Sequence, residues 1–223
     1  MAQDVSGLQS GSSTGGACPG TAGEGRPQLP VLGQPVVRER ADAVRNRRSV
    51  LEAAAALYAA RGVAEVSMDD IAVAAGVGKG TLYRRFADKS ALAAALLDDR
   101  ERDLQERMLS GPPPLGPGAS PQDRLAAFAD AYLRYVAAHL DLVAVSQTAS
   151  PGARLRTGAH RFWRQHCAHL LGLAGAPDPH LRADVLLAGL AAEQVRAWLE
   201  EHRGGTDELV PRVTRLARAL CRT

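Results

Sequence analysis

Apolar residues recur every three or four positions through most of the chain beyond residue 36, a spacing that gives a helix one buried face. The first such segment begins between Arg38 and Asp42 and ends at Gly62, where a glycine suits a helix C-cap. Strand-like alternation and β-branched or aromatic runs are almost absent. The pattern therefore predicts an all-α fold. The buried face of the first helix is expected to contain Leu51, Ala54, Ala55 and Tyr58.

Two short helices and a longer one are predicted next. Ser67, followed three residues later by Asp70, resembles a capping box, in which the serine oxygen accepts a hydrogen bond from a free backbone N–H. Gly76 ends this helix, and a third helix covers roughly residues 79–86. A fourth helix follows Asp88 as its N-cap residue and continues until a Gly-Pro-Pro-Pro-Leu-Gly-Pro-Gly segment breaks it.

The rest of the chain predicts further helices, several of which start near a proline. These helices cover residues 121–140, 142–149, 152–173, 181–202 and 207–221. Pro121, Pro151, Pro179 and Pro211 suit first-turn positions, where the N–H group that proline lacks would be unpaired in any case.

The first 37 residues differ from everything that follows. They are rich in glycine, serine, threonine and proline, and they carry too few bulky apolar groups to offset the entropy lost on ordering. We therefore expect a disordered N-terminal arm at 1–37, a small helical head at 38–87 and a larger helical body at 88–223.

Composition places the chain among soluble proteins, with 46% hydrophobic and 23% charged residues. No stretch approaches the roughly 18 uninterrupted apolar residues of a membrane span, and the N-terminus does not resemble a secretion signal. Cys18, Cys167 and Cys221 are odd in number and widely spaced, which favours neither a disulfide framework nor a zinc motif. The expected location is the cytoplasm, without a membrane partner.

The charge pattern directs attention to the third helix. A net charge of +3 is too mild for a protein that coats DNA indiscriminately, but it leaves room for a local basic patch. Of the 27 basic residues two are lysines, Lys79 and Lys89, and both lie in or beside this helix. A lysine ammonium is a compact point charge suited to phosphate. The segment is thus a candidate DNA-reading element.

Successive residues of the third helix point about 100° apart, which divides their roles. Leu82 and Phe86 are expected to face the first two helices, so the opposite side presents Gly80, Thr81 and Arg84. A guanidinium there can fork onto guanine, and the threonine can reach a base edge or a phosphate. Lys79, Tyr83 and Lys89 are better placed for phosphates. The full predicted DNA-binding set is Arg47, Ser67, Lys79, Gly80, Thr81, Tyr83, Arg84, Arg85 and Lys89.

The same glycines superficially resemble a phosphate-binding loop of a nucleotide-dependent enzyme. The residue five positions before Gly78 is Val73 instead of glycine, and Gly80 replaces the Ser or Thr required after the lysine. A helix instead of a strand precedes the turn. The spacing and context therefore reject this interpretation.

The segment Met68-Asp-Asp-Ile-Ala-Val-Ala-Ala-Gly-Val-Gly-Lys-Gly-Thr-Leu-Tyr-Arg-Arg-Phe-Ala-Asp-Lys-Ser-Ala-Leu closely resembles the N-terminal helix-turn-helix of the TetR family of bacterial transcriptional regulators. The resemblance extends from about Arg47 to Leu92. Two departures are Gly78, where the family often has a capping serine, and Ser90, where it often has glutamate. The resemblance implies a homodimer with a three-helix DNA-binding head, a fourth helix that leads into an effector-binding body, and repression relieved by a small molecule.

Aromatic residues at helical spacing in the body suggest a cavity for that effector, which is not identified by the sequence. The candidates are Phe128, Tyr132, Tyr135, His139, Phe162, Trp163 and His166, with Gln147, Gln194 and Trp198 as possible neighbours. Ordinary core packing is the alternative for each of them.

The C-terminal helices carry more apolar surface than a small body needs, and small residues such as Ala188 and Gly189 permit close helix approach. We expect a dimer interface in the form of a two-fold four-helix bundle, with packing inside one chain as the alternative. The interface candidates are Leu186, Leu190, Trp198, Leu209, Val213 and Leu216.

These features favour a DNA-binding repressor of a palindromic operator, a homodimer that a small-molecule effector releases. An activator, or a regulator without an effector, fits the same residues. An enzyme ranks far behind, because no nucleophile-elbow, zinc-protease, Ser-x-x-Lys or dinucleotide motif is present. No cofactor or metal is predicted, since the one cluster of possible ligands diverges around the helix. That cluster is His160, His166, Cys167 and His169.

Overall fold

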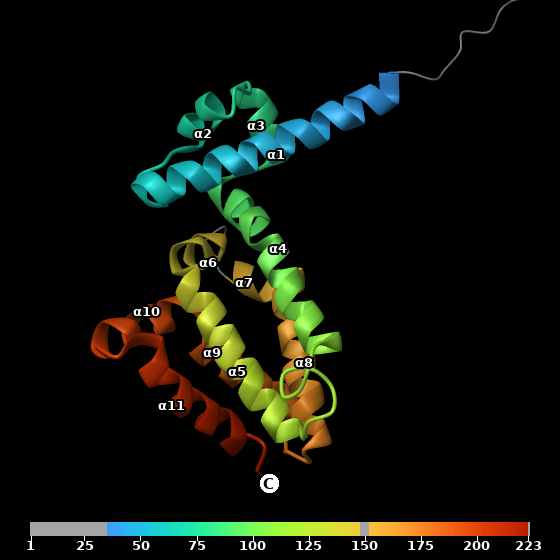
Figure 1. Ribbon diagram of the computed structural model, residues 1–223, viewed down its shortest axis with the longest axis vertical. Coiled ribbons are helices and arrows are strands. Elements are labelled where there is room, and N and C mark those ends of the chain that lie inside the picture. The colour runs from blue at the N-terminus through green and yellow to red at the C-terminus, as the bar shows by residue number, and fades with distance from the viewer. Residues whose placement is uncertain (1–34, 148–151, 223) are drawn as a thin grey trace, which may run out of the picture.

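The computed structural model describes residues 35–147 and 152–222, and within these ranges every regular element is a helix. The head contains α1 (Pro35–Arg61), α2 (Met68–Ala74) and α3 (Lys79–Arg85). The body contains α4 (Lys89–Ser110), α5 (Pro121–Ala138), α6 (Leu140–Ser146), α7 (Ala153–Arg156), α8 (Gly158–Leu173), α9 (Pro179–Gly189), α10 (Ala192–Glu201) and α11 (Gly205–Ala219). The predicted all-α fold is confirmed. Figure 1 shows the head at one end and α4 running from it into the body.

The predicted capping box at the start of α2 is present. The Asp70 backbone N–H donates to Ser67 Oγ at 3.1 Å, and the Ser67 N–H donates to the Asp70 carboxylate at 2.9 Å. The hydrogen bond from the Ser67 backbone holds the pKa of Asp70 below its usual value, because it favours the charged carboxylate. Gly62 and Gly76 adopt positive φ angles of 81° and 65° after α1 and α2, which glycine allows without strain.

The head has its own hydrophobic core, in which Leu82 and Phe86 are 1% and 4% exposed, as the helical period predicts. The buried face of α1 differs from the expected one at two of its four residues. Ala55 is exposed and Leu51 is half-buried, because the buried line of α1 passes through Val50 instead. The other buried members of this core are Ala54, Tyr58, Val63, Val66, Met68, Ile71, Ala72 and Leu92.

Helix α4 belongs to two cores at once. Leu92, in its first turn, is buried in the head core, whereas Leu97, Leu104 and Met108 are buried in the body core. The predicted division between 87 and 88 therefore falls just before a helix that both units share. Leu92 and Leu97 therefore attach the head and the body to one continuous helix.

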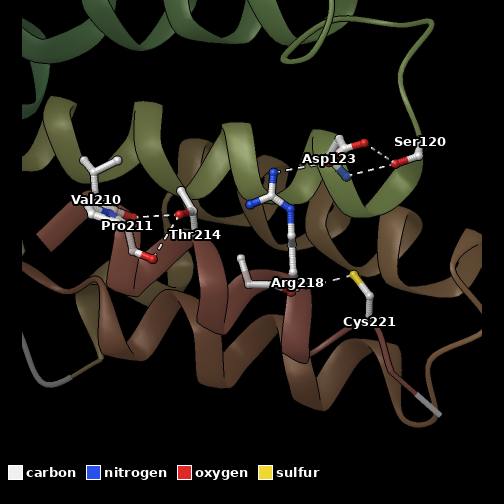
Figure 2. Close-up of polar contacts among 8 residues, drawn as sticks. Ser120, Asp123, Val210, Pro211, Thr214, Arg218 and Cys221 are labelled. Atoms are coloured by element: carbon white, nitrogen blue, oxygen red, sulfur yellow. Dashed lines mark hydrogen bonds and ion pairs between the residues drawn. The ribbon is translucent and has the colours of Figure 1, made fainter.

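The body is organised around α5, whose inner residues from Leu125 to Val136 are buried. Helix α5 packs against α8 and α11, and α8 packs against α9. Figure 2 shows how polar contacts fix α11 along α5: Arg218 Nη2 lies 3.2 Å from the Asp123 carboxylate, and Ser120 caps the helix that carries Asp123. Charged pairs at the edge of this contact thus align two helices whose apolar faces are already matched.

Several predicted boundaries are corrected. Helix α1 begins at Pro35, three residues before the expected start, and the predicted arm at residues 1–34 lies outside the described residues. The single helix expected at 181–202 is two helices, separated at Leu190 and Ala191. Thr157 likewise separates α7 from α8, because its hydroxyl caps α8 by accepting the His160 N–H at 3.1 Å.

Prolines follow the prediction in part. Pro121 and Pro179 occupy first turns, whereas Pro151 lies outside the described residues. Pro211 is inside α11, which begins at Gly205, and so its expected first-turn position is wrong. One turn later, the Thr214 hydroxyl donates to the Val210 carbonyl at 2.8 Å, so a side chain supplies a hydrogen bond near the proline (Figure 2).

Within the described ranges, no helix combines the length and apolarity that a membrane crossing demands.

Removal of the α2 cap should weaken the head. Ser67→Ala deletes the acceptor for the Asp70 N–H, and we expect a loss of about 1 kcal/mol in the free energy of unfolding, measured by urea denaturation with circular dichroism. Ser110→Ala is the matched control, because that hydroxyl donates to the Glu106 carbonyl at the exposed end of α4. Equal stability of Ser67→Ala and the control would contradict the assigned role of the cap.

Candidate nucleic-acid interface and ligand cavity

The third helix is held against the head by one face and presents the other outward. Burial of Leu82 and Phe86 fixes its rotation, so Gly80, Tyr83 and Arg84 are exposed and Tyr83 retains 47% of its surface. Gly78 precedes the helix without a side-chain cap, and its carbonyl accepts the Thr81 N–H at 2.9 Å. Thr81 is half-buried at the edge of this face. A convex, basic helix of this shape can enter a DNA groove.

Lys79 does not stand free. Its ammonium lies 2.5 Å from the carboxylate of Asp69 in the first turn of α2, and this hydrogen bond raises the pKa of the lysine. Both side chains are exposed, so the pair is weak in water and a phosphate can replace the carboxylate. Sequence reasoning missed this partner, although two opposite charges on either side of a glycine turn were a usable signal.

Other members of the predicted DNA-binding set have structural contacts. The Arg85 guanidinium donates to the backbone carbonyl of Ala43, so it fastens α3 to α1. Lys89 donates to the Ala64 carbonyl at 3.3 Å and lies 6.0 Å from the centroid of the Tyr58 ring. Ser67 serves the α2 cap, and Arg47 is half-buried on α1. Contact of these four residues with DNA stays a prediction.

The body contains a cavity of about 380 Å³ between α4 and the helices α5 to α8. Tyr132, Tyr135 and Trp163 from the predicted pocket line it, and so does Gln147. Its remaining lining residues are Ala94, Ala95, Asp98, Glu101, Val143, Ser146, Arg154, Thr157, Gly158, Ala159 and His160. The volume lies in the range typical of small-molecule sites.

All seven predicted aromatic and histidine residues form one continuous cluster. Tyr132 links the two halves, with ring centroids 5.4 Å from Phe128 and 5.8 Å from Trp163. Tyr135 contacts His139, and Phe162 contacts both Trp163 and His166.

Four of the seven, Phe128, His139, Phe162 and His166, are not among the residues that line this cavity. Phe128 is fully buried, and burial lowers the pKa of His166 to about 4, so that imidazole is neutral. These four residues belong to the aromatic cluster but do not line the cavity. Gln194 does not line the cavity either, and Trp198 borders a separate groove beside α11.

Charged groups at the cavity were not found from the sequence. The Tyr135 hydroxyl donates to the Glu101 carboxylate at 3.0 Å, and burial raises the pKa of Glu101. His160 is 4% exposed, its Nδ1 has no hydrogen-bond partner, and burial lowers its pKa. No sequence signal distinguished Glu101 from the other acidic residues of α4, because the fold alone turns it inward. In the described part of the chain no three His, Cys, Asp or Glu residues converge for a metal.

A family model matches most of the head, and curated proteins match part of the chain. The family model of bacterial regulatory proteins of the tetR family matches residues 50–96, which span the capped α2, the turn and α3. An HTH-type transcriptional regulator of Staphylococcus aureus is 45% identical over 65 residues, 29% of this chain and 34% of that protein. Residues 50–96 therefore form a helix-turn-helix of the TetR-family type.

Solved structures extend the likeness to the body. A TetR-like transcriptional regulator from Rhodococcus sp. RHA1 is 25% identical over 80% of this chain and 97% of its own, with a TM-score of 0.55. A TetR/AcrR regulator from Thermobifida fusca is 24% identical over 79% and 98%, with a TM-score of 0.58, and supports the fold. The chain spans about a third of the length of the curated S. aureus relative.

Helix α6 connects the cavity with the DNA-binding head. Ser146 and Gln147 at its end line the cavity, while the Ser146 carbonyl accepts a hydrogen bond from Ser90 Oγ at 3.0 Å. Ser90 is 7% exposed and directly follows Lys89. Leu142 of α6 packs against both hydrophobic cores. The serine that departs from the usual family pattern therefore attaches the first turn of α4 to α6.

The predicted dimer residues are largely internal to one protomer. Leu186, Leu190, Leu209 and Val213 are between 2% and 5% exposed, because α9 and α11 turn their apolar faces toward α8 and α5. These four side chains are already covered by helices of their own protomer, as the alternative of packing inside one chain expects, and their contact with a partner stays a prediction. Trp198 is half-buried against the body core, and Leu216 is 51% exposed.

The ion pair between Lys79 and Asp69 should limit binding to DNA. Asp69→Asn removes a competitor for the ammonium, so we expect about a threefold to tenfold gain in affinity for a non-operator duplex at low salt, measured by fluorescence anisotropy. Lys79→Ala should weaken the same binding. Asp130→Asn on α5 is the control for net charge. A gain with Asp130→Asn as large as that with Asp69→Asn would show that the pair is irrelevant.

Proposed function

We propose that this chain is a homodimeric transcriptional repressor of the TetR family that binds a palindromic operator and is released by a small-molecule effector. The observation that carries the proposal is the fixed rotation of α3, which buries Leu82 and leaves Arg84 outward. In such a dimer two α3 helices enter successive major grooves about 34 Å apart. Arg84 reads a guanine, Thr81 contacts a base edge or a phosphate, and Lys79 and Tyr83 bind phosphates. A protein with this role acts in the cytoplasm.

Release depends on the contact between cavity and head. A ligand in the cavity touches α4 through Ala94, Ala95 and Glu101 and touches the end of α6 at Ser146. Because α4 carries Leu92 in the head core, a ligand that prefers one α4 position also selects one spacing of the two heads. The effector acts only as far as its affinity differs between the two arrangements.

The dimer forms through α8 and α9. These helices pack together, and α9 exposes Leu181 and Val185 one turn apart at 62% and 56%, with Ala188 exposed one turn further on. Leu173 at the end of α8 is 60% exposed. Pairing of this face with its own copy gives the expected two-fold bundle of four helices, in which α9 was among the helices that the sequence suggested and α8 replaces α11.

The DNA-binding role is tested by selecting duplexes from a randomised pool with the full chain. We expect an inverted repeat whose half-sites lie one helical turn, or a multiple of it, apart. Arg84→Ala should weaken binding to the selected sequence by about 10- to 100-fold, through loss of a bidentate base contact, with less effect on unrelated DNA. Arg212→Ala, on α11 in the body, is the control of equal charge.

Absence of sequence enrichment would contradict operator reading by α3. Equal losses for Arg84→Ala on selected and unrelated duplexes would instead assign this arginine to the phosphate backbone.

The dimer face is tested by three variants. Leu181→Glu should convert the dimer to a monomer at micromolar concentration, measured by light scattering, because a carboxylate on this face is buried at the interface. Leu216→Glu, at an exposed leucine of the same chain, should leave the dimer intact. Leu186→Ala should instead lower the free energy of unfolding by about 2–5 kcal/mol, since it opens a cavity in the protomer core.

Dissociation by Leu216→Glu together with an intact Leu181→Glu dimer would place the interface on α11 instead. A monomeric wild-type chain would contradict the homodimer altogether.

A further inference from the structure

Glu101 carries a negative charge into the body without a counter-ion. Within the described residues no basic side chain forms an ion pair with it, and its one hydrogen bond comes from the Tyr135 hydroxyl. Asp98, one turn earlier, lines the same cavity but pairs on its outer side with Arg102. A carboxylate withdrawn from water without a cation is costly, and a positively charged ligand would remove that cost.

The wall beside Glu101 is aromatic. Tyr132, Tyr135 and Trp163 all line the cavity, and the Tyr132 ring lies 6.0 Å from Tyr135 and 5.8 Å from Trp163. Aromatic faces attract cations through their quadrupole, and they also offer flat surfaces on which a ring can stack. The site therefore matches a cation that is attached to a flat apolar group.

His160 provides an independent indication. The side chain lines the cavity and is 96% removed from solvent, yet its Nδ1 has no partner. Burial lowers the pKa of His160, so the ring is neutral and one of its nitrogens is an acceptor. Unmet acceptor capacity in the cavity that also contains Glu101 suits a ligand that donates hydrogen bonds.

Arg154 is the one Arg or Lys among the described residues that line the cavity. It extends from α7, across from the α4 wall, and donates to the Leu187 carbonyl at 3.3 Å. Arg154 and Glu101 are both partly exposed, and no ion pair joins them. Arg154 can meet an acceptor group of the same ligand, and it leaves the Glu101 carboxylate without an ion pair.

We propose that the ligand of this cavity is an organic cation, a protonated amine on a flat aromatic body, whose nitrogen pairs with Glu101 while its ring packs against Tyr132 and Trp163. The inference deepens the proposed function, on which it rests for the assignment of this ligand as the effector. Neither the acid nor the aromatic residues alone define the class. Their convergence on one cavity with an unpaired histidine does.

The test uses two flat ring systems of opposite charge, 9-aminoacridine and acridine-9-carboxylate, titrated into the full chain by calorimetry without DNA. We expect saturable binding of the cation and none of the anion. Glu101→Gln should weaken the cation at least tenfold, which is about 1.4 kcal/mol. Glu101→Asp, which keeps the charge, should retain the preference for the cation. Glu106→Gln, on the exposed side of α4, should leave its affinity unchanged.

Loss of binding through misfolding is separable from loss of charge. The glutamine can still accept the Tyr135 hydrogen bond, so Glu101→Gln should melt at the wild-type temperature or above it without ligand. Three results would overturn the inference: the anion binds as tightly as the cation, Glu101→Gln leaves cation affinity unchanged, or neither acridine binds at millimolar concentration.

A gel shift on the selected operator separates this inference from the proposed function. If 9-aminoacridine binds through Glu101 but the operator complex persists, the ligand class is supported and the effector role is contradicted. Because acridines also intercalate into DNA, the Glu101→Gln protein on the same operator is the control. If 9-aminoacridine releases the wild-type and the Glu101→Gln protein equally, it acts on the DNA, and the effector role is contradicted. The calorimetric result still decides the ligand class.

Discussion

The burial of one helix, α4, in two separate hydrophobic cores is the constraint on which the rest of this structure depends. Leu92 is fixed in the head and Leu97 in the body, so fewer than two turns of helix join the two units. Interiors are close-packed, and a helix anchored at both ends transmits displacement instead of absorbing it. Helix α4 also forms one wall of the cavity.

Helix α6 reinforces that connection with a polar contact. The Ser90 hydroxyl is buried, and its hydrogen bond to the Ser146 carbonyl satisfies a donor that would otherwise lack a partner. Ser90 is at the start of α4. Its hydrogen bond therefore joins the end of α6, which lines the cavity, to the turn of α4 that is buried in the head core. Glu101 forms no ion pair in the described part of the chain and accepts a hydrogen bond from the Tyr135 hydroxyl.

The head was largely predictable because its determinants are local. The capping box of Ser67, the positive φ of Gly76 and the spacing of Leu82 and Phe86 involve residues within one or two turns of each other. The body was predictable as helices but not as a packing arrangement. The break at Leu190 and the interior position of Pro211 were not predicted, nor was the separation of α7 from α8, although the last follows from the local cap at Thr157.

The sequence by itself determined that the chain is helical, where its DNA-reading helix lies and which face of that helix is outward, since periodicity and caps act over a few residues. Only the tertiary structure decided which apolar faces are internal. An amphipathic helix such as α9 has the same pattern whether it covers its own core or a partner, and Leu186 proved internal while Leu181 remained exposed. The same reason applies to Glu101, one acid among several on α4 until the packing of α5 turned it toward Tyr135.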